Sequence, residues 1–228
     1  MKKLIVLLLA LVLTCSLVAC SSGDNVRGSI SNDAAGENNS TENKQSTTEK
    51  QFDVGSVKTN KYTNEFLGVQ LTLDSGWIFK TDAEIEQANK DALGMVGDNY
   101  KELMENANTF TDMMAATADQ TGSIGVGFEK LTGSNTTLTE EQYVEMSKDT
   151  LKGALESMGF TNVVLTVSKA KFAGQEHVVV SISCQTNGTP FYESLAVVKC
   201  KNYMVTVTTS SLYTDNTKTY LNMFKPLA

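Results

Sequence analysis

The chain has 228 residues, of which 41% are hydrophobic and 20% are charged. Its 19 basic and 26 acidic side chains give a net charge of −7, which disfavours nucleic acids and anionic headgroups as partners. The composition is that of a globular protein, and about 170 residues remain for one domain with one core once the N-terminal region is set aside.

The first twenty residues have the pattern of a secretory signal. Two lysines precede an apolar run over residues 4–13, and the segment closes with Leu-Val-Ala-Cys at positions 17–20. The run is too short to cross a bilayer, which needs roughly 20 apolar residues. A cleaved secretory peptide without lipid, or an uncleaved anchor, would be the alternatives.

The ending at Cys20 resembles the lipobox of bacterial lipoproteins, in which the cysteine is lipidated and becomes the new N-terminus. The resemblance implies that residues 1–19 are a signal peptide and that Cys20 carries a diacylglyceryl group. One acyl chain binds a membrane only marginally, whereas two make a lasting anchor. We therefore predict a protein held to the cell membrane by lipid on Cys20, on the extracytoplasmic side.

Residues 21 to about 57 are mostly Ser, Asn, Gly, Glu, Lys, Thr and Gln. Such a segment cannot bury enough apolar surface to offset the entropy of ordering, so the sequence predicts a disordered polar tether over 20–57, after the lipidated cysteine. Roughly 36 flexible residues have an r.m.s. reach of ~30–35 Å. An interaction tail is the alternative interpretation.

The folded region is expected over residues 58–228 as a single domain. Apolar and polar residues alternate over 69–73, and Gly68 favours a tight turn, so residues 62–73 are expected to form a hairpin. Trp77, the only tryptophan, is interpreted as a core anchor rather than as a ligand-stacking residue.

Thr81 and Glu84 have the spacing of a capping box, which predicts that a helix begins there. Nine acidic residues and two lysines lie between positions 81 and 120. Because no calcium-loop spacing occurs among them, we expect a solvated helical face and no metal site.

A hairpin is expected from the strands at 110–116 and 123–131. Gly125 and Gly127 would share one face of the second strand, where another element can pack closely. The glycine spacing matches no phosphate-binding loop.

Thr139 and Gln142 form a second capping-box pattern, and Gly159 is a natural stop, so a helix is predicted over 139–158. The expected buried stripe consists of Tyr143, Met146, Thr150, Leu151, Ala154, Leu155 and Met158.

Four more strands are expected, at 163–172, 176–186, 191–200 and 203–209, with two-residue hairpin turns between them, and a short helix over 214–224. The third of these strands is apolar on both faces and should be covered on both sides. The predicted fold is therefore α+β: a mostly antiparallel sheet with helices on both faces, an α/β/α sandwich.

The Leu-Asp-Ser-Gly-Trp stretch ending at Trp77, and Asp112-Met-Met-Ala115 followed by Ser123-Ile-Gly-Val126, resemble the PsbP-like family, including its DcrB-like bacterial lipoproteins. The element order over about residues 60–226 is similar too. Where members typically have proline before Gly-Trp, this chain has Asp-Ser. The resemblance implies the PsbP-like sandwich and a non-catalytic accessory or binding role.

Sequence motifs for catalysis are missing. His177, the only histidine, lies on an expected strand, where a structural or merely exposed role is the ordinary one. No Gly-x-Ser-x-Gly, His-Glu-x-x-His or Cys-x-x-Cys is present. We therefore predict a non-catalytic envelope module that binds an envelope protein or a small ligand, with no cofactor. A carboxylate-dependent hydrolase and a purely structural protein are the alternatives.

Cys184 and Cys200 are expected to be free, separately buried thiols. A two-residue turn at Asn187-Gly188 would place Cys184 opposite Phe191, and Cys200 would then point to the other face at the far end of its strand.

Overall fold

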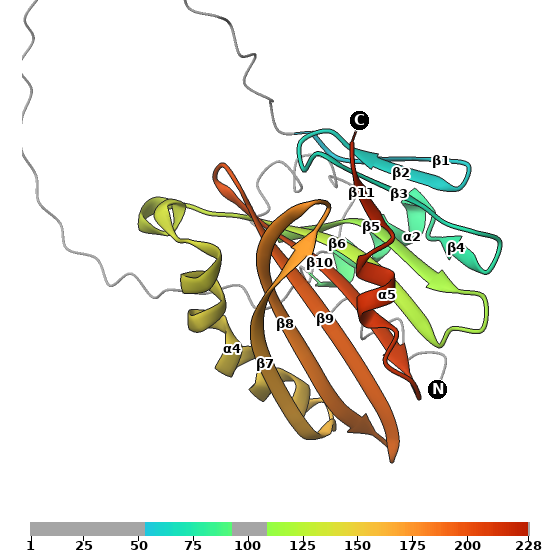
Figure 1. Ribbon diagram of the computed structural model, residues 1–228, viewed down its shortest axis with the longest axis vertical. Helices are drawn as coiled ribbons and strands as arrows, with labels where there is room; N and C mark the ends of the chain where they lie inside the picture. The colour runs from blue at the N-terminus through green and yellow to red at the C-terminus, as the bar shows by residue number, and fades with distance from the viewer. Residues whose placement is uncertain (1–52, 93–108, 228) are drawn as a thin grey trace, which may run out of the picture.

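The computed structural model describes residues 53–92 and 109–227, which form an α+β fold built on two antiparallel sheets (Figure 1). The smaller sheet has the order β1-β2-β3-β11. Its strands are β1 (Ser56–Lys58), β2 (Lys61–Asn64), β3 (Val69–Thr72) and β11 (Phe224–Pro226). The expected hairpin over 62–73 is thus confirmed, and Gly68 takes a φ of +75° in its turn.

The larger sheet has seven strands in the order β4-β5-β6-β10-β9-β8-β7. These are β4 (Trp77–Phe79), β5 (Thr109–Thr117), β6 (Gly122–Lys130), β7 (Thr161–Phe172), β8 (Gln175–Thr186), β9 (Thr189–Cys200) and β10 (Tyr203–Leu212). All the predicted strands are present, with ends within three residues of those expected. The three predicted two-residue turns close the β7 to β10 meander, because Ala173-Gly174, Asn187-Gly188 and Lys201 supply the positive φ values that such turns need.

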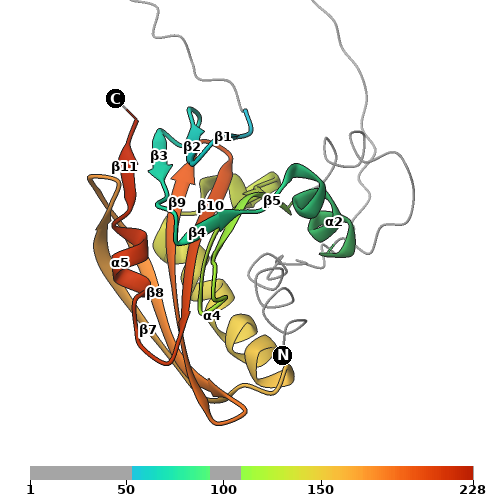
Figure 2. The ribbon, with the colours of Figure 1, turned by 90° about the vertical axis from the view of Figure 1, so that its right-hand side faces the viewer.

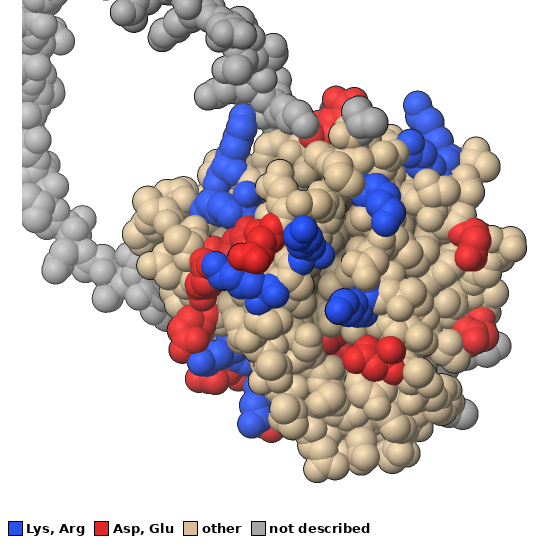
Figure 3. All heavy atoms as spheres, viewed as in Figure 1, with Lys and Arg blue, Asp and Glu red and all other residues tan. Residues whose placement is uncertain are grey.

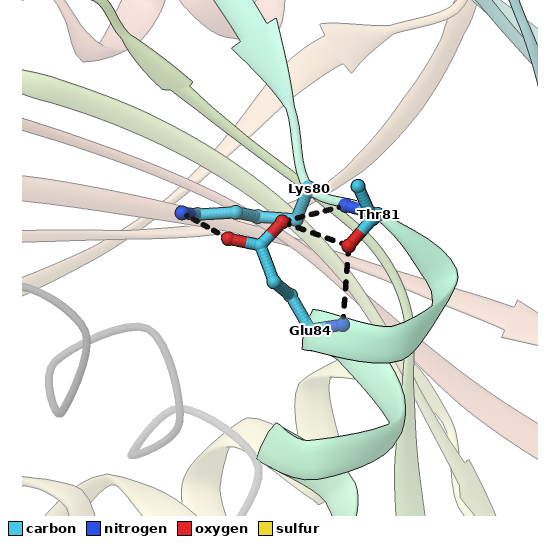
Figure 4. A network of polar contacts seen from close by, with 3 residues as sticks. All are labelled: Lys80, Thr81 and Glu84. Carbon is cyan, nitrogen blue, oxygen red and sulfur yellow. Dashed lines mark hydrogen bonds and ion pairs between the residues drawn. The ribbon is translucent and has the colours of Figure 1, made fainter.

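Three α-helices and one 3-10 turn occur among the described residues: α2 (Asp82–Ala92), η1 (Gly133–Thr137), α4 (Glu140–Ser157) and α5 (Thr217–Leu221). Both predicted capping boxes are confirmed. In α2 the amide of Glu84 donates to the Thr81 hydroxyl at 3.3 Å, and the Glu84 carboxylate accepts from the Thr81 amide at 2.8 Å (Figure 4). In α4 Thr139 and Gln142 exchange the same pair of bonds.

Two hydrophobic cores lie on opposite faces of the large sheet. The predicted strand with two apolar faces is β9, whose Leu195 and Val197 join one core while Ala196 and Val198 join the other. One core lies under α4; the other lies between the large sheet, the small sheet and α5. Figure 2 shows α4 and α2 on one side of the sheet, and α5 and β11 on the other.

The α+β class is therefore confirmed, whereas the sandwich with helices on both faces is not. Much of the second face is covered by a small sheet, and the one helix on that side, α5, has five residues. The expected final helix over 214–224 is shorter because its last residue, Phe224, belongs to β11 and pairs with Leu71.

Two further expectations need correction. In the stripe of α4, Met146 is 49% exposed and Thr150 is exposed, and Val144 and Ser147 are buried in their place, because the buried arc is centred on a different side of the helix. Trp77 is half-buried at the edge of the core, where its ring meets Tyr220 edge-on at 4.8 Å.

A carboxylate joins the two sheets. Asp112 of β5 accepts hydrogen bonds from the Tyr62 hydroxyl at 2.6 Å, from the Asn64 amide at 3.0 Å and from the backbone amide of Gly55 at 2.9 Å. A bulge in the β5–β6 pairing falls between Thr111 and Met113 and frees Asp112 from strand alternation. Burial raises the pKa of Asp112, and the hydrogen bonds from Tyr62, Gly55 and Asn64 only partly offset this.

The Asp112 contacts also hold the start of the folded region. Gly55 bonds to the domain and β1 begins at Ser56, two residues before the expected domain start at 58. Residues 1–52, with the predicted signal, Cys20 and most of the tether, lie outside the described residues, as do positions 93–108 of the acidic segment.

The backbone of Gly55 approaches Tyr62 and Asp112 so closely that a Cβ there would overlap both side chains. We expect Gly55→Ala to lower the free energy of unfolding by about 1–3 kcal/mol, the usual cost of overpacking, and to lower the urea midpoint. Gly153→Ala is the matched control, because nothing lies within 4 Å of a Cβ there and alanine favours a helix. Equal midpoints for the two variants would contradict the close packing at Gly55.

Candidate functional site

The large sheet divides at one end into two hairpins. The β8–β9 pairing ends at Val178↔Val197, although its register would continue with His177 opposite Val198 and Glu176 opposite Lys199. Past that point β8 stays paired with β7 and β9 stays paired with β10. Figure 1 shows the β7–β8 hairpin curling away from the β9–β10 hairpin. We call this divergence the fork.

The carboxylate of Glu140, the first residue of α4, lies at the root of the fork. One oxygen accepts from the backbone amide of Lys199 at 3.0 Å, and the other accepts from the backbone amide of Val178 at 3.1 Å. The same carboxylate lies 2.8 Å from Nδ1 of His177. Glu140 therefore provides the acceptor that a carbonyl of a neighbouring strand would otherwise provide. It satisfies two backbone amides at the point where β8 and β9 diverge.

The electrostatics of Glu140 follow from these contacts. Partial burial acts to raise its pKa, but the hydrogen bonds from His177, Lys199 and Val178 outweigh burial and hold the pKa below its usual 4.5. The carboxylate is therefore ionised at neutral pH. Its charge also lies at the N-terminus of α4, where the helix dipole favours an anion.

His177 has the structural role that the sequence led us to expect, since it is a half-buried partner of Glu140. Its ring also meets Phe172 edge-on at 6.2 Å. Sequence reasoning missed Glu140. The available signal was a glutamate directly after an N-cap threonine, but that position ordinarily serves only the helix dipole.

A pocket of about 470 Å³ opens beside the fork, between the two sheets, and we call it the fork cleft. The β2–β3 turn, the β7–β8 turn, the ends of β8 and β9 and the C-terminal residues enclose it. Residues of apolar type form most of its lining, but the surface that they and the polar residues present to it is more polar than apolar. The lining residues are Phe66, Leu67, Gly68, Val69, Phe172, Ala173, Val198, Pro226 and Leu227, with Gln175, His177, Lys199 and Cys200 as the polar members. A concave pocket that presents polar groups beside apolar side chains can bind a small ligand.

The polar members of the lining differ in what they offer a ligand. The Lys199 amine donates to the Thr136 carbonyl at 2.8 Å, so it is already engaged. Gln175 is exposed, and Cys200 is half-buried. The cleft can thus hold an apolar group beside a hydrogen-bonding one, with hydrogen bonds from an amide, an imidazole and a thiol.

Neither described cysteine is in a disulfide, as predicted, but the expectation that both are buried holds only for Cys184. Cys184 pairs with Phe191 and is buried, and burial raises the pKa of its thiol to about 12. Cys200 is only half-buried, because it lies where the strands diverge. Cys184 is therefore inert, whereas Cys200 lies at the cleft.

The buried carboxylates of the described residues are dispersed rather than paired. Asp112 contacts Tyr62, Glu129 contacts Tyr143, and Glu140 contacts His177. Glu193 of β9 is 4% exposed, and burial raises its pKa to about 8, so it is mostly protonated at neutral pH. No cluster of three or more His, Cys, Asp or Glu side chains suited to a metal occurs in the described ranges.

Comparisons with known proteins identify no family. No family model matches the chain. No curated protein matches it either. The PsbP-like resemblance therefore stays a prediction.

Solved structures similar to the chain include one from Bacteroides thetaiotaomicron VPI-5482, with a TM-score of 0.41 and 10% identity over 75% of this chain. The chain spans about half of that protein, 49% of its length. Another is LpqN, involved in cell envelope biogenesis of Mycobacterium tuberculosis, with a TM-score of 0.39 and 14% identity over 68% of this chain and 76% of LpqN. Neither similarity assigns an activity to this chain.

We expect Glu140→Gln to destabilise the protein, because an amide presents one acceptor oxygen where the carboxylate presents two. One backbone amide at the fork would lose its partner, which costs about 1–3 kcal/mol. Asp149→Asn, on the exposed surface of the same helix, should unfold near the wild-type midpoint.

The effect of Glu140→Gln should depend on pH. A folded-state pKa below the unfolded one gives stability that is present above pH 4.5 and is lost as the pH falls through the folded value. The difference in unfolding free energy between wild type and Glu140→Gln should therefore be present at pH 7 and narrow as the pH falls below 4.5. Urea titrations at several pH values measure it, and a difference that widens in acid would contradict the assignment.

Proposed function

We propose that the protein is a membrane-anchored extracytoplasmic lipoprotein whose folded domain is a non-catalytic binding module, with the fork cleft as its binding site. The observation that carries the proposal is the cleft itself, a hollow of about 470 Å³ that presents polar groups beside apolar side chains. His177 lines the cleft and contacts Glu140 at 2.8 Å, which joins β8 to α4.

Anchoring through Cys20 is supported by the signal pattern at positions 1–20. None of the helices among the described residues is long and apolar enough to span a membrane. A lipid would hold the domain near the bilayer through the tether, within ~30–35 Å on average.

Cys20→Ser should abolish lipidation, so that the protein is shed or retained as its precursor. Detergent phase partitioning and gel mobility measure the change. Cys15→Ser is the matched control and should behave as wild type, because Thr14 is a poorer cut-site residue than Ala19. Unchanged partitioning of Cys20→Ser would refute the lipid anchor.

Binding in the fork cleft is tested by filling it. Gln175 is exposed and lines the cleft, so Gln175→Trp should block it without disturbing either core. Ser181→Trp is the control, since Ser181 is exposed on the same strand but outside the cleft.

We expect wild type and Ser181→Trp, but not Gln175→Trp, to retain the same ligand from an envelope extract. If all three proteins retained the same ligand, the fork cleft would not be its binding site. The thiol of Cys200 gives a second readout, because a bound ligand should slow its labelling.

A further inference from the structure

We propose that two copies of this chain pair through β7, in antiparallel orientation, to form a continuous sheet across a two-fold axis. This goes beyond the binding role of the fork cleft and does not depend on it. Strand β7 is at the end of the strand order and, within the described residues, pairs with β8 alone. The edge of a sheet presents backbone groups on which another strand can pair.

The exposed edge of β7 contains a stretch that is unusual for an edge strand. Residues 161–168 carry no charge, and Val164 and Val167 are 57% and 47% exposed. A long, uncharged, β-branched edge predicts a strand partner or aggregation. Lys169 and Lys171 follow this stretch, and the β7–β8 register shifts between Thr161 and Val164, so the regular uncharged edge spans residues 164–168.

The charges favour a second copy in antiparallel orientation. A parallel in-register partner would place each lysine of β7 beside its own counterpart, which is unfavourable. An antiparallel partner centred on the uncharged stretch places the two pairs of lysines at opposite ends of the interface.

The neighbouring helix carries a matching pattern. Glu141, Glu145, Lys148 and Lys152 are spaced by three or four residues and share one flank of α4. The ion pair between Glu141 and Lys169, at 2.8 Å, shows that this flank lies toward β7. In an antiparallel pair of α4 helices, Glu141 would face Lys152 of the other copy while Glu145 faces Lys148. Figure 3 shows acidic and basic side chains interspersed on the side of the molecule where α4 lies.

The helix and the strand specify the same two-fold axis. The charge pattern on the helix is symmetric about the midpoint between Glu145 and Lys148. At 1.5 Å per residue, that midpoint lies about 8 Å along the helix axis from Glu141. Helix and strand run in opposite directions, so that distance corresponds to about 2.5 strand residues back from Lys169, near Thr166 and Val167. The centre inferred from the charges therefore falls within the uncharged stretch.

Disulfide trapping tests the pairing in the full chain, in membrane fractions under mild oxidation. A cysteine at the two-fold axis lies opposite its own copy, close enough to bond. We expect Thr166→Cys or Val167→Cys to give a cross-linked dimer on non-reducing gels. Ala170→Cys is the control, because it is exposed on the same strand but is separated from its copy by roughly 20 Å or more.

The second test is sedimentation of the full chain in density-matched detergent. Wild type should have twice the mass of one chain, Val167→Lys should lose at least tenfold in dimer affinity, and Ile78→Lys should remain dimeric. Ile78 is 59% exposed on β4, the opposite edge strand, so it is a matched control. A monomeric wild type, equal trapping at position 170, trapping of a different protein, or a dimer unaffected by Val167→Lys would each overturn the proposal.

Discussion

The structure depends on one carboxylate that lies where the large sheet divides. Beyond Val178↔Val197 the β8–β9 pairing stops, and Glu140 accepts hydrogen bonds there from the amides of Val178 and Lys199. An unsatisfied buried amide is costly, so the strands can diverge only because an acceptor comes from elsewhere. The same contact fixes where α4 begins over the sheet, and the divergence gives the fork cleft one of its walls.

A second carboxylate acts in the same way between the sheets. Asp112 reaches from a bulge in β5 to Tyr62, Asn64 and Gly55, and so ties the small sheet and the start of the chain to the large one. Each of the two carboxylates belongs to one layer of the fold and accepts hydrogen bonds from groups in a neighbouring layer. The fork cleft lies between the two sheets that Asp112 joins, whereas Glu140 holds α4 to the other face of the large sheet.

The positions of the fork cleft and of the β7 edge determine whether a ligand and a second copy of the chain can bind at the same time. The cleft is at the end of the sheet where the two hairpins separate, and the unprotected edge of β7 flanks the first of them. A partner on β7 would leave the inner wall of the cleft free, because Gln175 and His177 belong to the next strand, β8. Ligand binding and pairing of copies are therefore compatible on this fold.

The local elements could be read from the sequence because their signals are local. Capping residues, the two-residue turns and the alternation along β9 depend on neighbours in the chain, and each is found where it was expected. Cys184 opposite Phe191 followed from turn length alone. What the sequence could not determine was set by contacts between residues far apart in the chain. Phe224 lies in a strand rather than in the helix because it pairs with Leu71. Glu140 contacts the sheet because β8 and β9 diverge beneath the start of α4. The second face of the large sheet is covered by strands from residues 56–72 and 224–226, which are far apart in the sequence.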